Sequence, residues 1–287
     1  IMSSDWSSDV CSSDLRGPVR EKEDRIAGRF QQAMSDLNLP AEAGKRGVTV
    51  AVPEVLYNSL YAPMWRFFLH RLGFTVQDPV RSRSALGEGK RIVNADFCAP
   101  MIHAHGAFAE CLNRGADHIF FPSMVNEKNP GQEEHRFKKK MSDAFFCYYS
   151  QYLPSIMSKL TAVDVEDKLI SPLILLNSQS EEEIIGELLG ELSPRFPDIT
   201  EEEIGAAYRE ASGRYRKGRE SWSRVYENSA DPEKIEIALT GRPYIAMNRA
   251  LHLDIPAKLE ALGTQVYWQD EFDLSGFETG YASKYLE

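Results

Sequence analysis

Several classes of protein are excluded by what this 287-residue chain lacks. It has no run of about 18 apolar residues, so we expect no membrane-spanning helix. It has no basic segment followed by an apolar core, so we expect no signal peptide. Four cysteines are too few for a disulfide scaffold, which favours a reducing compartment and a cytoplasmic location. The formal net charge of −10 argues against a nucleic-acid partner.

Common nucleotide and nucleophile motifs are also missing. The chain contains no G-x-x-x-x-G-K-[ST], no G-x-G-x-x-G and no G-x-S-x-G pattern. We therefore predict neither a phosphate-binding P-loop nor the common dinucleotide or hydrolase sites. What remains is a globular composition, with 43% apolar and 26% charged residues.

The first residues look foreign to the rest of the chain. Ser3–Leu15 reads SSDWSSDVCSSDL, with Ser-Ser-Asp three times and few apolar residues. It resembles the translated read-through of a sequencing adapter, so we interpret residues 1–15 as a disordered artefact of a gene fragment. The alternative is a natural disordered N-terminus. Without Cys11, three cysteines remain: Cys98, Cys111 and Cys147.

The rest of the chain divides into four segments that differ in their hydrophobic pattern. Residues 16–46 read as a helix and a linker, because an apolar face ends at a segment rich in proline and glycine. Residues 47–178 alternate short apolar runs with helical patterns. Residues 179–229 read as two helices, which begin at the capping boxes of Ser180 with Glu183 and Thr200 with Glu203. Residues 230–287 resume the alternation.

This alternation predicts an α/β fold with parallel sheets covered by helices. We expect two Rossmann-like lobes, at 47–178 and 230–287, joined by a long helical connection. We expect the second lobe to be truncated, because it is too short for a complete sheet and its alternation of strands and helices is still incomplete at Glu287. Individual strands are predicted at 47–53, 74–76, 118–121, 144–147, 169–176, 235–240 and 264–268, and helices at 59–72, 98–114, 148–160, 200–228 and 251–262.

Three turns in the first lobe each follow an apolar stretch. In such sheets, ligands bind beyond the carboxyl ends of the strands. Cys98 and Cys147 each stand where a helix should begin, and helix N-termini favour a thiolate, the form that binds metals. Both could equally be small buried hydrophobes, because their spacing matches no metal motif. The third turn holds Ser123, and Cys111 falls in mid-helix, where a core role is expected.

Other polar residues carry weaker signals. His103 and His105 point apart on a helix, so a shared metal would require an extended segment. Glu127 and the run Lys138–Lys140 lie in a polar stretch, and the lysines read as a solvated face, with anion binding as the minor alternative. Asp270 and Glu271 follow a strand and could accept a proton or a hydroxyl group, although exposed carboxylates are common at such positions. The turn Gly241, Arg242, Pro243 and Tyr244 also follows a strand, and its arginine could bind a carboxylate or phosphate or belong to a plain turn.

Several of these segments, taken in order, resemble acyl-CoA dehydratase activase-related proteins, whose cysteine-containing region is similar to 2-hydroxyacyl-CoA dehydratase subunits. The resemblance covers about residues 47–275. It rests on Val52–Leu56, Trp65–Phe68, Leu72–Phe74, Cys98–Pro100, His105–Gly106, Asp117–Pro122, Cys147, Tyr152–Pro154 and Gly241–Tyr244. The chain departs from the family pattern at three positions: Glu54 replaces an arginine, Ser123 a frequent cysteine, and Ile245 a frequent histidine.

The resemblance implies a protein of anaerobic metabolism with a [4Fe–4S] cluster between its lobes. It implies Cys98 and Cys147 as cluster ligands, with Ser123 and Gly241, Arg242, Pro243 and Tyr244 lining the cofactor site. The implied partners are ATPase activator modules, fused or separate, and an acyl-CoA dehydratase or a related reductase. We therefore expect an electron-transfer or accessory region. The alternatives are a cluster-free docking domain and a dehydratase subunit that acts on a CoA thioester.

Overall fold

Four short parallel strands form the central sheet of the protein. The computed structural model describes residues 25–40, 44–80, 84–127, 145–160 and 165–273. The sheet has the order β2-β1-β3-β5, built from β1 (Thr49–Ala51), β2 (Thr75–Val76), β3 (His118–Phe120) and β5 (Leu169–Ile170). All its pairs are parallel, because a helical crossover separates each strand from the next in the chain. The predicted α/β class is thereby confirmed.

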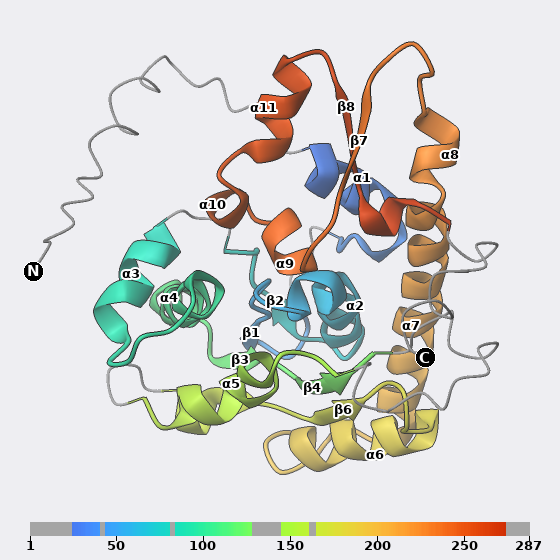
Figure 1. The fold of residues 1–287 in the computed structure, drawn as a ribbon. Coiled ribbons are helices and arrows are strands. Elements are labelled where there is room, and N and C mark those ends of the chain that lie inside the picture. The colour runs from blue at the N-terminus through green and yellow to red at the C-terminus, as the bar shows by residue number, and fades with distance from the viewer. Residues whose placement is uncertain (1–24, 41–43, 81–83, 128–144, 161–164, 274–287) are drawn as a thin grey trace, which may run out of the picture.

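Helices cover both faces of this sheet (Figure 1). Helix α2 (Asn58–Arg71) packs on one face and α4 (Ala99–Asn113) on the other, while α3 (Ser84–Ile92) packs on α4, and α5 (Tyr148–Ser158) packs on the strand at residues 123–126. Alternate strand residues point to opposite faces. Val50 and Phe120 therefore join the core beneath α2, whereas Ala51 and Ile119 join the core beneath α4.

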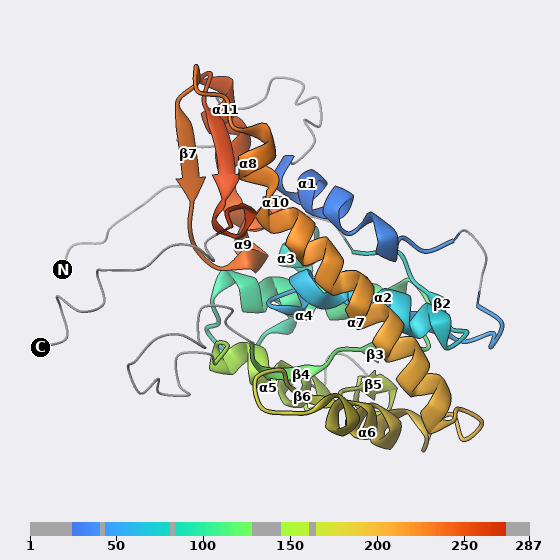
Figure 2. The ribbon, with the colours of Figure 1, turned by 90° about the vertical axis from the view of Figure 1, so that its right-hand side faces the viewer.

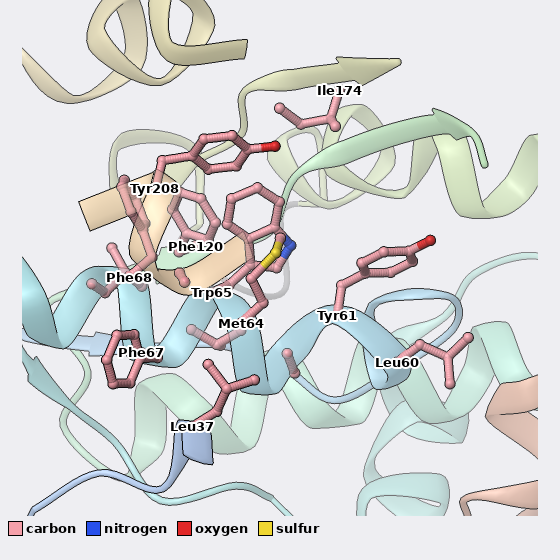
Figure 3. Packing of buried hydrophobic residues seen from close by; sticks show 14 of the residues in the cluster. Leu37, Leu60, Tyr61, Met64, Trp65, Phe67, Phe68, Phe120, Ile174 and Tyr208 are labelled. Atoms are coloured by element: carbon pink, nitrogen blue, oxygen red, sulfur yellow. The ribbon is translucent and has the colours of Figure 1, made fainter. Parts of the chain in front are cut away.

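The core beneath α2 is rich in aromatic rings. Trp65 and Phe68 of α2 meet Phe120 of β3, and Trp65 also stacks against Tyr208 (Figure 3). The same cluster includes Val266 and Trp268 from the C-terminal part of the chain. A continuous apolar core therefore connects the first sheet to that part, while the predicted limits at 47–178, 179–229 and 230–287 stay predictions.

Glycines permit the close approach of α3 and α4. A Cβ atom on Gly106 would lie 1.8 Å from the carbonyl oxygen of Ala85, and one on Gly89 would lie 1.8 Å from that of Ile102. No side chain fits at such distances, so these two positions require glycine. Gly106 is thus a packing residue.

The strand pair β3–β5 continues beyond two prolines. After Pro122 and Pro172, β4 (Ser123–Asn126) pairs with β6 (Leu173–Leu175), again in parallel. We predicted that the first strand would stop at Pro122, but it resumes, because a proline removes a single donor and leaves the strand direction unchanged. The strand predicted at 144–147 is only an isolated bridge between Phe145 and Asn126, and residue 144 lies outside the described residues.

Two capped helices follow, as predicted. They are α6 (Glu181–Leu192) and α7 (Glu201–Ser223). At each start the Ser180 or Thr200 side chain accepts from the backbone N–H of Glu183 or Glu203, and the glutamate side chain accepts in return. The helix predicted to reach residue 228 ends at Ser223, and a short helix α8 (Val225–Ser229) follows. Helix α7 runs from α6, below the first sheet, up to the second sheet (Figure 2).

The second sheet has two parallel strands, β7 (Glu236–Leu239) and β8 (Gln265–Trp268). The helices α9 (Pro243–Ala246), α10 (Arg249–His252) and α11 (Ile255–Ala261) lie between them in the chain. The single helix predicted at 251–262 is divided, because Leu253 and Asp254 are left-handed, with φ of 54° and 57°. Pro256 accounts for the break, since its ring would clash with the carbonyl of His252 in a continuous helix.

The described chain also contains α1 (Arg25–Ala33) and the 3₁₀ turns η2 (Ser35–Leu37), η5 (Glu166–Lys168) and η6 (Gln269–Glu271). The suspected artefact at 1–15 lies outside the described residues. Within the ranges that are described, no helix combines the length and the apolar character needed to cross a bilayer.

Candidate functional site

Cys98 is the N-cap of helix α4, as predicted. Its backbone is extended, with ψ of 155°, and its carbonyl accepts from the N–H groups of Met101 and Ile102. Pro100 stands in the first turn, where a missing N–H costs nothing. The thiol is free and exposed at the positive end of the helix.

Cys147 occupies the same position on helix α5. Its carbonyl accepts from the N–H groups of Ser150 and Gln151, and its thiol is free and half-buried. The amide of Gln151 also donates to the carbonyl of Phe146 at 2.7 Å, which fixes the turn before the helix. Both cysteines therefore begin helices at the edge where the parallel strands end.

Aromatic contacts bring these two turns together. The ring of Phe97, next to Cys98, meets Tyr149 of α5 edge-on, with centroids 5.6 Å apart. The same ring stacks on His105 at 5.3 Å. Phe97 thus joins the start of α4 to the first turn of α5, and the two thiols belong to one region of the surface.

The turn after β7 reaches the same region. Arg242, the N-cap of α9, donates from Nη1 to the hydroxyl of Tyr57 at 3.1 Å. Tyr57 stacks on Phe146 at 3.8 Å and meets Tyr244 edge-on at 5.3 Å. Cys147 lies near enough to contribute to the pKa values of Tyr57, Arg242 and Tyr244. The structure thus assembles Cys147, Arg242 and Tyr244 around Tyr57.

The two phenols in this group stay protonated at neutral pH. Burial raises the pKa of Tyr57, and the guanidinium of Arg242 opposes that shift. Burial raises the pKa of Tyr244 to about 12, again against the effect of Arg242. Around Arg242 the structure therefore offers neutral hydroxyl groups, and among the described residues no carboxylate forms an ion pair with its guanidinium. An anionic group could bind there.

Ser123 supports the turn of Cys147 through a hydrogen bond to helix α5. It is the first residue of β4, and its hydroxyl donates to the carbonyl of Gln151 at 3.1 Å. Since Gln151 holds the turn of Cys147, Ser123 helps to position that cysteine. Gly241 precedes the arginine with φ of 152°, and its N–H donates to Gln269, which follows β8.

The remaining candidates have structural partners. Cys111 is buried, and desolvation raises its pKa to about 12, so it is a core thiol. His105 Nδ1 lies 2.7 Å from the carbonyl of Met101, whereas His103 Nε2 lies 3.2 Å from the amide of Asn248. The two histidines thus face different partners, as the helical spacing predicted.

The interpretation of Glu271 as an exposed carboxylate was wrong. Its side chain is 0% exposed and binds Arg29, because η6 (Gln269–Glu271) turns back onto the core after β8. Glu127 and Asp270 are also half-buried, and Tyr61 and Arg219 respectively bind them. The run Lys138–Lys140 lies outside the described residues.

Tyr57 and Phe97 were missed from the sequence. Tyr57 follows β1 at the carboxyl edge, where ligands bind in such sheets, so its position was a usable signal. The residue before it, Leu56, is left-handed with φ of 49°. Such strain in a bulky residue collects at functional sites. Phe97 carried no signal beyond its place next to Cys98.

The described residues fit part of a ligand set for an iron–sulfur cluster. Cys98 and Cys147 offer two thiols in one region, and a [4Fe–4S] cluster is usually held by four. Within the described ranges, no group of three His, Cys, Asp or Glu side chains could hold a metal ion. These residues thus supply at most two thiolates, and any complete set needs ligands from elsewhere.

Comparison with known proteins identifies the family. The sequence model of the CoA enzyme activase uncharacterised domain (DUF2229) matches residues 49–272, which include both cysteine turns and the Arg242 turn. No curated protein matches the chain. No solved structure matches it either. Because the match covers most of its length, the chain belongs to the CoA enzyme activase domain family.

Proposed function

We propose that this chain is an electron-transfer or accessory region that supports the reductive activation of acyl-CoA dehydratases. Membership of the activase domain family supports a role related to that activation. The observation that carries the finer proposal is the placement of Cys98 and Cys147. Both are N-caps of helices, and Phe97 and Tyr149 join their turns.

In this proposal the two cysteines are ligands of a [4Fe–4S] cluster. A cluster of this type supplies a one-electron redox centre when bound. The helix N-terminal amides stabilise the negative charge of both thiolates. Ser123 positions the turn of Cys147 through Gln151, and the phenols of Tyr57 and Tyr244 present neutral donors beside it. The remaining ligands come from outside the described residues.

The proposed partners follow from the family and from the missing phosphate motifs. Without a P-loop in this chain, ATP hydrolysis would belong to activator modules, either fused or separate. The second partner is an acyl-CoA dehydratase or a related reductase. We place the complex in the cytoplasm, because the three described cysteines are free thiols.

The test is anaerobic reconstitution with iron and sulfide, followed by iron analysis and an absorbance spectrum. We expect a broad band near about 400 nm in the parent protein, with bound iron lost in Cys98→Ala and Cys147→Ala. Cys111→Ala is the matched control and should keep its iron, since that thiol is buried in the core. If the parent protein binds no iron, or if all three variants bind it equally, the cluster proposal is wrong.

A cluster-free docking domain is the second candidate. The hydroxyl of Ser123 is used in a structural hydrogen bond, which favours a supporting role for this turn. This candidate predicts that the activator or dehydratase binds the parent protein and both cysteine variants with equal affinity. A dehydratase subunit, in contrast, would bind a CoA thioester by itself, which calorimetry with the thioester would detect.

A further inference from the structure

Contacts at both its backbone and its guanidinium hold Arg242 in place. The residue begins helix α9, where its carbonyl accepts from the N–H of Ile245 at 2.9 Å. Its Nη1 donates to the hydroxyl of Tyr57 at 3.1 Å, and its side chain also hydrogen-bonds the hydroxyl of Tyr244. Helix α9 packs on α2, the helix that follows Tyr57 (Figure 1). Residues from both sheets therefore fix the position of this positive charge.

The two phenols that hold Arg242 are fixed in turn beside Cys147. The ring of Tyr57 stacks on Phe146 at 3.8 Å and meets Tyr244 edge-on at 5.3 Å. Phe146 directly precedes Cys147 in the chain, so the stack brings the phenols and the guanidinium to that cysteine. Consistent with this geometry, Cys147 contributes to the pKa values of Tyr57, Arg242 and Tyr244.

The positive charge of Arg242 is left without a carboxylate. Across the described ranges of the chain, its guanidinium forms no ion pair with an Asp or Glu side chain. Burial lowers the pKa of Arg242, and Tyr244, Tyr57 and Cys147 together raise it by more. The two phenols are neutral at neutral pH, because burial raises the pKa of each. Of these three neighbours, only Cys147 can then carry a negative charge.

We propose that Arg242 is a positioning residue that stabilises negative charge at Cys147. A fixed positive charge attracts an anionic group to this thiol and repels a cationic one. In a cluster bound through Cys147, the same charge favours the reduced state, which holds one more electron, supplied by the proposed activator. Net charge and hydrogen bonds near the sulfurs set the potential of such clusters. The inference deepens the proposed function and, where it concerns the cluster, rests on it.

Charge-selective labelling of the cluster-free protein tests the charge at the thiol. In a Cys11→Ser background, the protein reacts with two methanethiosulfonates of similar size, the anionic sulfonatoethyl and the cationic trimethylammonioethyl reagent. Mass spectrometry gives the rate constant of each at Cys147. We expect the ratio of anionic to cationic rate constants to fall about tenfold in Arg242→Gln, and to stay within about threefold of the parent ratio in Arg242→Lys. Arg249→Gln is the matched control and should keep the ratio, since Asp254 already pairs with Arg249 at 2.8 Å.

The ratio separates a role of charge from a role in structure. If Arg242 only holds the fold, Arg242→Gln would change the access of both reagents alike, and an unchanged ratio would overturn the inference. Salt provides a test without any variant at Arg242. In the parent protein the ratio should fall as the salt concentration rises from about 0.01 M to about 1 M, because the Debye length shortens from about 30 Å to about 3 Å. A ratio that does not respond to salt would contradict the inference, even if Arg242→Gln fails to fold.

The reduction potential is the readout for a bound cluster. After reconstitution, a redox titration followed by absorbance should give a lower potential for Arg242→Gln than for the parent protein, with most of the difference restored in Arg242→Lys. Equal potentials in the parent protein and Arg242→Gln would contradict a role at the cluster. If the parent protein binds no cluster, the proposed function is wrong, whereas the labelling ratio still decides whether Arg242 stabilises negative charge at Cys147.

Discussion

Nη1 of Arg242 donates to the hydroxyl of Tyr57 at 3.1 Å, across a separation of 185 residues in the sequence. One residue follows a strand of the first sheet, and the other follows a strand of the second. Their hydrogen bond therefore joins the carboxyl edges of the two sheets directly beside Cys147.

Tyr57→Phe should lower the free energy of unfolding by about 1 kcal/mol, the usual loss for one hydrogen bond. The ring contacts with Phe146 and Tyr244 would remain, so the change isolates the hydroxyl. Urea denaturation monitored by circular dichroism measures it. Tyr148→Phe is the control and should have no effect, since Tyr148 is 72% exposed. Equal losses in both variants would contradict a specific role for the Arg242 contact.

Glu271→Ala should be far more destabilising, by about 3 kcal/mol. Glu271 accepts from Nε and Nη2 of Arg29 at 2.6 and 2.7 Å and from the N–H of Trp268 at 2.8 Å. Its removal would leave a half-buried guanidinium without its partner. In the exposed ion pair of Lys159 and Glu166, Glu166→Ala should change the unfolding free energy by less than about 1 kcal/mol. Chemical denaturation of both variants makes the comparison.

Mild acid should destabilise the protein through its buried histidines. Burial lowers the pKa of His103 and His105 below the ordinary value. The unfolded chain therefore binds more protons, and stability falls as the pH drops below about 6.5. Glu127 acts in the opposite sense, because its pKa is raised.

The difference between the parent protein and His103→Gln isolates one of these groups. Unfolding free energies measured at about pH 7.5 and about pH 5 should show a smaller acid loss in the variant. The glutamine side chain can still accept a hydrogen bond from Asn248, so the comparison changes the titration more than the contact. An identical loss in the two proteins would show that His103 does not titrate on unfolding.

Thiol labelling should separate the cysteines into two classes. In a Cys11→Ser background, Cys98 and Cys147 should react rapidly with a disulfide reagent, because their thiols reach solvent. Cys111 should react only after unfolding, since it is buried and its pKa is raised to about 12. Mass spectrometry of the labelled peptides identifies each site. Rapid labelling of Cys111 in the folded protein would contradict its place in the core.

Local sequence signals were sufficient for most elements. The apolar runs and capping boxes predicted most of the strands, the start of α7 at Thr200 and the α/β class, because each signal involves residues close in sequence. The strand after Pro122 was missed, and the strand predicted at 144–147 is only an isolated bridge. The division of the helix at Leu253 and Asp254 was missed, although Pro256 was a signal for it. Both cysteines were correctly predicted to begin helices.

The assembly of the site could not be predicted in the same way. The stacking of Tyr57 on Phe146 and the reach of Arg242 depend on how the two sheets pack, and no short pattern encodes that. The burial of Glu271 depends on Arg29, which lies 242 residues away in the sequence. Residues at strand ends look equally polar whether they face solvent or another part of the chain.

The two prolines of the strand pair have a mechanical consequence. Pro122 and Pro172 lie at the same level, since Ile119 pairs with Leu169 before them and Ser123 with Leu173 after them. Neither proline has an N–H to donate, and the pairing is carried there by the N–H groups of Phe121 and Ser123, which donate to the carbonyls of Ile170 and Pro172. Helix α4, with Cys98, packs on β3 before this level, and helix α5, with Cys147, packs on β4 beyond it. A group that bridges both thiols would therefore connect the parts of the strand pair that lie before and after the two prolines.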